Sequence, residues 1–506
     1  MNKRSAALAN LSFSSSTVIF VAAFGLVMVP LYLQRMSTAT YGAWLASGNI
    51  VSFLTIFESG LSTVATQRLA GAFGRRDLTA FSLIAGSSIT TAMGIGIFVL
   101  VVTAVISPLI ARLVHAPADQ YRAITSAMTL AGAGSGLGVL HLSLGAIPQA
   151  LQRTVVPGII GLVSTCLGLI AVLLGLHLGF GVIALAFGPF TVSLTYVIGY
   201  SWQLLWLWRT LQLPRMTVSI EQVLELFRES RILLLSTLSS AVNNNSEPAI
   251  AAIFVSAEAS AVLVLTGRLL TVLQMFLARI GSAVFAGVAI VASVADVDAK
   301  RRIVREIVVL TTGFMGAGLA LALAFSRPVI SLWVGEKLYG GNILLIILAF
   351  STLWTARRVF LYNLTIAFGR IGRSAGLMIA DTAIRLALLP FFAWLLGVRG
   401  IPMSSGTASM VTTILLSLLL CRTIRTSWKS LFLPGVRAFG ASMTIGCLWL
   451  NFAPVARSWP TIAGQGILAS VIMVVSMITL DPEFKVGVLH NLALIRTRLA
   501  LKAVSA

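Results

Sequence analysis

Long apolar runs alternate with short polar segments along this chain, from Leu11 to Leu480. Each run is on the order of 20 residues, which is the length that an α-helix needs to cross the hydrocarbon layer of a membrane. The runs are continuously apolar instead of alternating at every second residue, so they predict helices and not the strands of a membrane barrel. The pattern therefore predicts an all-α polytopic membrane protein.

The apolar runs predict about 14 transmembrane helices. The predicted spans are 11–34, 43–66, 81–110, 123–147, 157–178, 181–208, 232–255, 261–285, 306–333, 342–368, 374–396, 401–421, 434–453 and 461–480. An even number of crossings returns the chain to the side on which it began. We therefore expect both termini on the same side of the membrane.

Most lysine and arginine residues fall in the connections on the side of the N-terminus, and cytoplasmic loops are enriched in these residues. We therefore expect both termini to be cytoplasmic. The formal net charge of +21 belongs to a chain with only 10% charged residues, so it is spread over short loops that face anionic headgroups. Membrane lipids, and no nucleic acid, are the partners that this charge predicts.

The spans group as six, six and two, separated by polar connections. We expect an N-lobe over 1–208, a cytoplasmic linker with an interfacial helix over 209–231, a C-lobe over 232–422, and two last helices with a cytoplasmic tail over 423–506. The linker helix is predicted by apolar residues at helical spacing, which include Ile220, Leu224 and Phe227. The two six-helix lobes are expected to be pseudo-symmetric.

Ionisable side chains inside the apolar spans are the candidate functional residues. A charge at bilayer depth costs at least about 2.5–3.5 kcal/mol, so such a residue normally faces a cavity, a partner or a substrate. The set is Glu58, Glu247, Arg268, Arg279, Arg357, Arg358, Asp381 and Arg385. The 3 cysteines and 4 histidines are dispersed and show no metal-ligand spacing, so we expect neither a metal site nor a cofactor.

Two sequence blocks contain recognisable motifs. The first block holds the segments Tyr41-Gly42-Ala43-Trp44 and Glu58-Ser59-Gly60-Leu61, and the second runs from Glu247-Pro248 to Thr266-Gly267-Arg268-Leu269. These blocks resemble the polysaccharide transporter family of O-antigen and exopolysaccharide flippases, the second block resembling its seventh and eighth helices. Members often carry aspartate in place of Glu58 and Glu247, which preserves the carboxylate.

The resemblance implies the multidrug/oligosaccharidyl-lipid/polysaccharide flippase superfamily, in which two lobes alternate between inward-open and outward-open states. It implies translocation of undecaprenyl-diphosphate-linked oligosaccharide repeat units to the periplasmic leaflet of the bacterial inner membrane, without enzymatic chemistry. The polysaccharide polymerase and the export machinery are the protein partners that it implies. Related lipid II flippases carry arginines in their first helix, whereas the span 11–34 has none.

The arginines are the candidate ligands of a diphosphate, because a guanidinium stays charged and binds phosphate oxygens bidentately. Arg268 and Arg279 are predicted on nearly one face of the eighth helix, about 16 Å apart. Arg358 shares a face of the tenth helix with Trp354 and Tyr362, and Arg357 is its neighbour. Structural pairing with carboxylates from other helices is the alternative for each arginine.

The carboxylates Glu58 and Glu247, the latter on one helix face with Asn243, are candidates for H⁺ or Na⁺ coupling or for balancing the arginines. Asp381 and Arg385 stand four residues apart, so we expect them to neutralise each other. We interpret His141, in a glycine-rich helix, as a packing residue.

Two other functions remain open from the residues. A cation-coupled multidrug extruder would line its cavity with carboxylates and aromatic residues, which the surplus of arginines opposes. A membrane-embedded glycan polymerase or ligase would normally place its catalytic residues in sizeable outer loops, and the predicted outer loops are short.

Overall fold

The computed structural model describes residues 25, 27–54, 60–151, 153, 155–277, 288, 296–452 and 458–489, and it is all-α over these ranges. Within them, 8 helical stretches are long and apolar enough to cross a membrane, or up to 9 if a bent pair forms one span. One stretch, Gly372–Ile424, contains two helices that pack against each other. A single helix of that length would be about 80 Å long, much longer than one membrane crossing needs. The predicted fold class is confirmed, whereas the total of about 14 spans stays a prediction, since the span 11–34 lies mostly outside the described residues.

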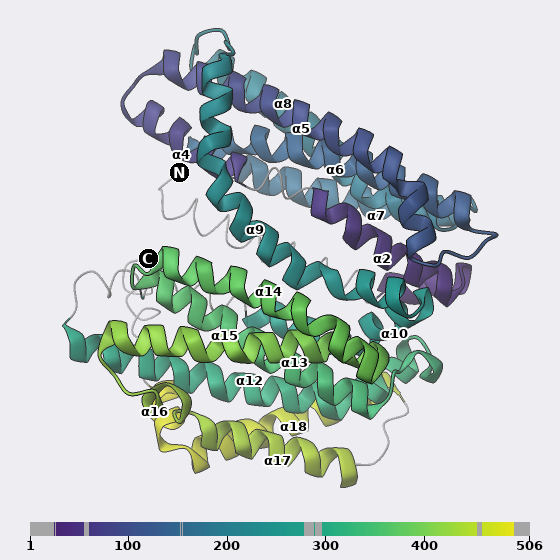
Figure 1. Cartoon of the computed structure of the whole chain (residues 1–506), viewed down its shortest axis with the longest axis vertical. Coiled ribbons are helices and arrows are strands. Elements are labelled where there is room, and N and C mark those ends of the chain that lie inside the picture. The colour runs from purple at the N-terminus through teal and green to yellow at the C-terminus, as the bar shows by residue number, and fades with distance from the viewer. Residues whose placement is uncertain are drawn as a thin grey trace, which may run out of the picture. The chain divides into compact units, whose positions relative to one another are not determined.

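The chain divides into two compact units, Met1–Ala261 and Val262–Ala506. Unit 1 contains α2 (Thr38–Leu54), α4 (Leu61–Gly74), α5 (Leu78–Leu113), α6 (Tyr121–Ala150), α7 (Val155–His177), α8 (Ile183–Thr210) and α9 (Ile220–Phe254). Helix α6 packs against both α5 and α8, and α7 packs against α8 (Figure 1). Regular helices satisfy every backbone group internally, which is why apolar runs of this length fold in this way.

Glycines set the closest helix contacts in unit 1. A Cβ on Gly96 of α5 would lie 2.6 Å from the carbonyl oxygen of Gly136 on α6, so the two backbones touch where neither residue has a side chain. Gly42 has a similar role, because its Cβ would lie 1.7 Å from the carbonyl oxygen of Ala257. The glycine of the Tyr41-Gly42 segment therefore allows the first motif block to pack directly against the second.

Helix α9 joins the expected linker helix and the expected seventh span in one continuous helix of 35 residues. At its start, Leu226 is buried among Leu61, Val64 and Val139. Near its end, the carbonyl of Ala252 is 2.9 Å from Nδ1 of His115. Helix α9 therefore packs along the length of unit 1. The position of its first turns at the membrane interface and the boundaries of the two lobes stay predictions.

The expected eighth span is broken. Helix α10 (Ala257–Thr266) and the following helix Arg268–Leu277 meet at an angle of 54°, with Gly267 between them. Gly340 donates its backbone N–H to Oγ1 of Thr266, the last residue before the break, at 2.9 Å. Beyond the break, Nε2 of Gln274 donates to Oγ1 of Thr352 at 3.1 Å.

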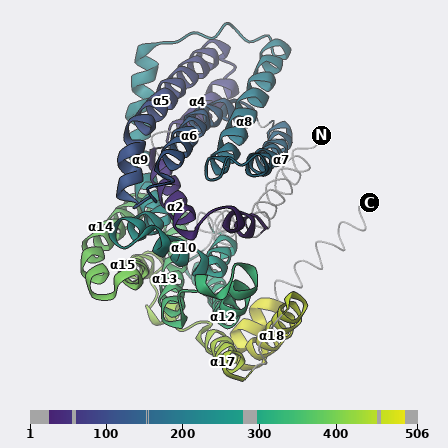
Figure 2. The same cartoon turned by 90° about the vertical axis from the view of Figure 1, so that its right-hand side faces the viewer.

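Unit 2 contains α12 (Val297–Trp333), α13 (Asn342–Ala367), α14 (Ile371–Leu396), α15 (Gly400–Ile424), α16 (Lys429–Phe432), α17 (Val436–Phe452) and α18 (Trp459–Leu480). Helix α15 packs against both α13 and α14, whereas α17 and α18 pack against α12 (Figure 2). Phe484, which follows α18, is buried with Val309 and Met477.

Candidate functional site

The described residues include seven of the nine side chains that the sequence nominates as substrate-binding or coupling residues. Arg279 and Glu58 lie outside them, so the expected ladder of Arg268 and Arg279 stays a prediction.

Arg358 of α13 forms a buried ion pair with Asp381 of α14. The distance from Nη1 to Oδ2 is 3.0 Å, and the two side chains are 2% and 1% exposed. Nη1 also lies 3.2 Å from Sδ of Met378. Asp381 was expected to neutralise Arg385 within one helix, which stays a prediction, and the ion pair with Arg358 in addition joins two helices. The guanidinium of Arg358 is therefore enclosed by protein groups in this conformation, and its contact with a substrate stays a prediction.

Arg357, the neighbour of Arg358, is also enclosed by protein. Its Nη1 donates to Oγ1 of Thr312 on α12 at 2.6 Å, and Nη2 donates to the carbonyl of Leu431 on α16. The guanidinium carbon lies 5.6 Å from the ring centre of Phe432. Arg357 therefore links α13 to α12 and α16, and a substrate could reach it only if these contacts opened.

Trp354 and Tyr362 are partly exposed on α13. The backbone carbonyl of Trp354 accepts a bond of 3.4 Å from Oγ1 of Thr413 on α15. The carbonyl of Tyr362 accepts from Thr365, which in turn bonds Oγ of Ser374 on α14 at 2.8 Å. The polar stripe of the tenth predicted helix therefore takes part in helix packing, and its contact with a substrate stays a prediction.

Arg268 differs from the other two described arginines of the predicted site. It is the first residue after the helix break and is only partly buried. Its Nε is buried and has no hydrogen-bond partner within the described part of the chain, as is also true of Nε of Arg358, but Arg358 has Asp381 as an ion-pair partner and Arg268 has no such partner among the described residues. A buried guanidinium N–H without an acceptor is costly, and an anionic group at this position would relieve that cost. Arg268 is therefore the best-placed described cation for a phosphate.

Glu247 and Asn243 lie four residues apart on α9, in unit 1, and both are partly buried. Each interacts with neighbouring groups. Pro248 lies inside α9, and the helix continues beyond it to Phe254. The coupling role of this pair stays a prediction.

Unit 1 also contains a cavity that the sequence reasoning did not predict. It has a volume of about 520 Å³ and lies between α4, α6, α7 and α8. Its described lining is mostly polar and aromatic, with a few apolar residues: Ser62, Thr63, Thr66, Gln67, His141, Leu142, Gly145, Gln149, Pro157, Tyr196 and Tyr200. None of these described side chains is a carboxylate, a lysine or an arginine. We call this space the unit 1 cavity.

Three rings form one wall of the unit 1 cavity. His141 is stacked on Tyr196 with ring centres 4.6 Å apart and planes 13° apart, and Tyr196 lies 5.5 Å from Tyr200. The sequence interpretation of His141 as a packing residue accounts for the stacking but overlooks the cavity. The sequence did contain a pattern that could have indicated this wall. His141, Gly145 and Gln149 are spaced four residues apart on α6, as are Tyr196 and Tyr200 on α8, so each set lies on one helix face.

On the surface of unit 1, α4 is joined to the start of α9 by charged groups. Arg68 donates through Nε and Nη2 to Glu229 at 2.9 and 2.6 Å, and through Nη1 to Glu225 at 2.9 Å. Bonding to Arg68 lowers the pKa of Glu225 to about 2. The bidentate geometry fixes the first turns of α9 against α4.

Comparisons with known proteins agree on the architecture. The structure is similar to an inward-facing multidrug resistance MATE family transporter of the MOP superfamily, with a TM-score of 0.68, 15% identity, and coverage of 82% of this chain and 98% of that chain. It is also similar to the lipid II flippase MurJ in an inward closed conformation, with a TM-score of 0.67, 13% identity, and coverage of 92% and 98%. A MOP superfamily transporter from Pyrococcus furiosus aligns with a TM-score of 0.57, 14% identity, and coverage of 83% and 94%.

These identities are low, so the structural similarities establish the fold alone. No curated protein matches the sequence. The family model for polysaccharide biosynthesis proteins matches residues 7–285, which is more than half of the chain and includes both motif blocks. The chain therefore belongs to the polysaccharide biosynthesis protein family and has the fold of MOP superfamily transporters.

Proposed function

We propose that this protein translocates polyprenyl-diphosphate-linked oligosaccharides, of the undecaprenyl type, from the cytoplasmic to the periplasmic leaflet of the bacterial inner membrane. Family membership supports a role in polysaccharide assembly, and the MOP transporter fold supports alternating access. The reaction moves a molecule between leaflets and needs no covalent step.

The observation that carries the proposal is Arg268. A cation at the break of a bent membrane helix, with a buried N–H left without an acceptor, is suited to an anionic headgroup. The diphosphate is the part of a lipid-linked oligosaccharide that every substrate of this class shares. The glycan can then vary while this contact is retained.

The test begins with native mass spectrometry of the protein purified with its lipids, which identifies any bound lipid-linked glycan. That lipid, fluorescently labelled on its sugar, is reconstituted with the protein in vesicles, and its appearance in the opposite leaflet is measured. We expect Arg268→Ala to lower transport more than Arg268→Lys. Arg399→Ala removes an exposed arginine of the same unit and serves as the matched control.

Two outcomes would contradict the proposal. Wild-type protein that leaves the lipid-linked glycan in place but exports a cationic dye would support a cation-coupled multidrug extruder. Wild-type transport by Arg268→Ala would remove Arg268 from the mechanism.

Coupling to H⁺ or Na⁺ through Glu247 is part of the same proposal. Glu247→Gln should remove the response of transport to an imposed pH or Na⁺ gradient while leaving downhill movement of the lipid. An unchanged gradient response would show that the coupling group lies elsewhere. We propose that the transported lipid-linked oligosaccharide is then passed to a polymerase and to the export machinery.

A further inference from the structure

We propose that the unit 1 cavity binds an uncharged sugar ring of the transported glycan, with Tyr196 and Tyr200 as its aromatic platform. This inference rests on the proposed function in one respect, namely that the cargo carries a glycan. It adds a glycan subsite that is separate from the residues assigned to the diphosphate. All of the described residues that line the cavity belong to unit 1.

The size and lining of the cavity suit a small polar ligand. Its volume of about 520 Å³ lies within the range of about 300–1,000 Å³ that is typical of small-molecule sites. Hydroxyl and amide groups come from α4 and α6, on residues such as Ser62, Gln67 and Gln149. These groups both donate and accept hydrogen bonds, which is what the hydroxyl groups of a sugar require.

The aromatic wall complements the other side of a sugar. A pyranose ring presents C–H groups on its faces and hydroxyl groups around its edge. The weakly positive C–H groups pack favourably against the negative face of an aromatic ring. His141 occupies one face of Tyr196, with ring centres 4.6 Å apart, and so holds the ring that a ligand would contact.

Glycines on neighbouring helices allow both tyrosines to lie where they do. A Cβ on Gly161 of α7 would be 2.8 Å from Oη of Tyr196, and a Cβ on Gly145 of α6 would be 3.0 Å from Cε2 of Tyr200. Any larger residue at Gly161 or Gly145 would have to displace a tyrosine. The two glycines thus leave the space in which the tyrosine rings lie.

Packing of the aromatic rings against each other does not explain the polar space beside them. The space is open to the surroundings, since lining side chains such as Gln67 and Gln149 are exposed, and it is bordered by polar groups. A polar cavity of this kind holds water when empty, and sugar hydroxyl groups can replace that water with little loss of hydrogen bonding.

The charge of the described cavity lining distinguishes between a cationic drug, a diphosphate and an uncharged sugar as ligands. The described lining has no carboxylate, so it offers no counter-ion to a cationic drug. It also has no lysine or arginine, so it offers none to a diphosphate. An uncharged sugar is the part of the proposed cargo that matches this lining.

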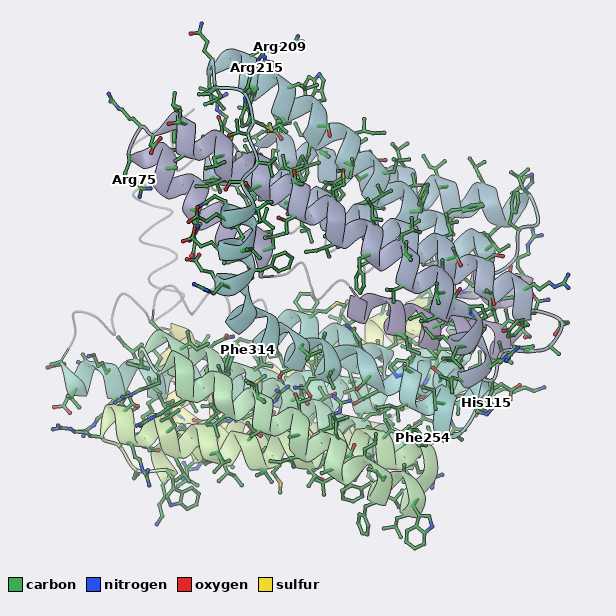
Figure 3. All side chains as sticks on the ribbon, turned by 45° about the horizontal axis from the view of Figure 1, so that its top comes forward. Arg75, His115, Arg209, Arg215, Phe254 and Phe314 are labelled. Carbon is green, nitrogen blue, oxygen red and sulfur yellow. The ribbon has the colours of Figure 1, made fainter. Side chains whose placement is uncertain are left out.

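The cavity lies toward the basic end of unit 1. Arg75 follows α4 and Arg209 lies in the last turn of α8, and both lie with Arg215 at one end of the unit, opposite His115 and Phe254 (Figure 3). Gln149 is near the end of α6 and Pro157 is in the first turn of α7, on the side of these arginines, whereas Gln67 lies midway along α4. This is the end that the distribution of basic residues predicts to be cytoplasmic, where a lipid-linked glycan would enter.

The first test compares aromatic substitutions in the vesicle transport assay, using the glycan lipid that co-purifies with the protein. We expect Tyr196→Leu to raise the KM for this lipid roughly tenfold, whereas Tyr196→Phe, which keeps the ring, stays near wild type. Trp202→Leu is the matched control, because Trp202 lies on the same helix and is 64% exposed. Size-exclusion elution of each variant verifies folding. Wild-type kinetics in a folded Tyr196→Leu/Tyr200→Leu double variant would overturn the subsite.

The second test measures occupancy without transport. Cys166 and Cys447, the exposed cysteines, are changed to serine, and Gln149→Cys is labelled with a maleimide. We expect the glycan lipid to slow labelling, and undecaprenyl diphosphate without sugar to leave it unchanged. Equal protection by both lipids, or by neither, would overturn the subsite while leaving the flippase proposal intact. Protection by the glycan lipid alone, in a protein that fails to transport it, would support the subsite and reject the proposed function.

Discussion

In unit 2, Arg357 and Arg358 are bonded to protein groups and buried, whereas in unit 1 neutral hydroxyl, amide and aromatic groups surround a cavity of about 520 Å³. Both regions place polar groups inside membrane-spanning helices. The arginines were conspicuous in the sequence because a charge in hydrocarbon is costly. That cost can be met by a protein partner as well as by a ligand, so charge alone does not distinguish a structural residue from a binding residue.

The largest expected effect concerns the ion pair of unit 2. Arg358→Leu leaves Asp381 buried without this partner and should destabilise the protein by about 3–5 kcal/mol, measured by the unfolding midpoint in detergent. Arg373→Leu, an exposed arginine on α14, is the control and should change little.

A double variant sharpens this result. Replacing Arg358 and Asp381 together by leucine should recover much of the lost stability, because apolar residues often substitute well for a buried pair. If Arg358→Leu alone leaves the midpoint unchanged, the pair is not what holds α13 against α14.

The next effect concerns Arg357. Arg357→Met removes the bonds to Thr312 and to the carbonyl of Leu431, and hydrogen bonds of charged groups contribute about 1.5–3 kcal/mol. The midpoint should fall by about that amount, while transport per folded molecule should be retained. A fall in transport beyond the loss of folded protein would show that Arg357 also contacts cargo.

A smaller effect is expected from the glycines behind the aromatic platform. Gly161→Ala should push against Tyr196 and lower transport efficiency roughly threefold to tenfold, which corresponds to about 0.7–1.4 kcal/mol. Gly138→Ala is the control, since the nearest atom would be Oγ of Ser193 at an ordinary 3.7 Å. Equal losses in both variants would indicate general damage to helix packing instead of a displaced ring.

The smallest effect concerns the surface contact between α4 and α9. The folded pKa of Glu225 is about 2, below its ordinary value of 4.5, so its contribution is present above pH 4.5 and is lost as the pH falls toward 2. Hydrogen exchange at the start of α9 should therefore be nearly constant between pH 7 and pH 5, after correction for the intrinsic exchange rate. Arg68→Gln should speed this exchange across that range, and a rise confined to pH 5–6 would contradict the assignment.

Much of the fold was predictable from the sequence. The predicted span 81–110 corresponds to α5 (Leu78–Leu113), and the predicted span 342–368 corresponds to α13 (Asn342–Ala367). Runs of apolar residues determine such elements locally, because a membrane helix satisfies its own backbone. The break at Gly267 was not predicted, since the hydropathy of 261–285 is continuous and the bend depends on the contacts around it.

The candidate site was predictable only in part. The sequence nominated Arg268 as a charged residue inside a predicted span, but the absence of an acceptor for its Nε among the described residues and its position at a helix break required the structure. Asp381 lies four residues from Arg385, which predicts a local pair, and the structure also joins Asp381 to Arg358, 23 positions away in the chain, which the sequence did not predict. Sequence spacing describes neighbours on one helix and contains no information about which helix packs opposite.

The sequence by itself determined that this is an all-α membrane protein of the polysaccharide biosynthesis family, because hydrophobic length and local motifs are properties of contiguous residues. The tertiary structure decided which polar groups are partners and which line a space. His141, Tyr196 and Gln149 come from two helices and meet at one cavity only after those helices pack. A cavity is the volume that packing leaves unfilled, and that volume is set by the three-dimensional arrangement of helices and not by any single run of residues.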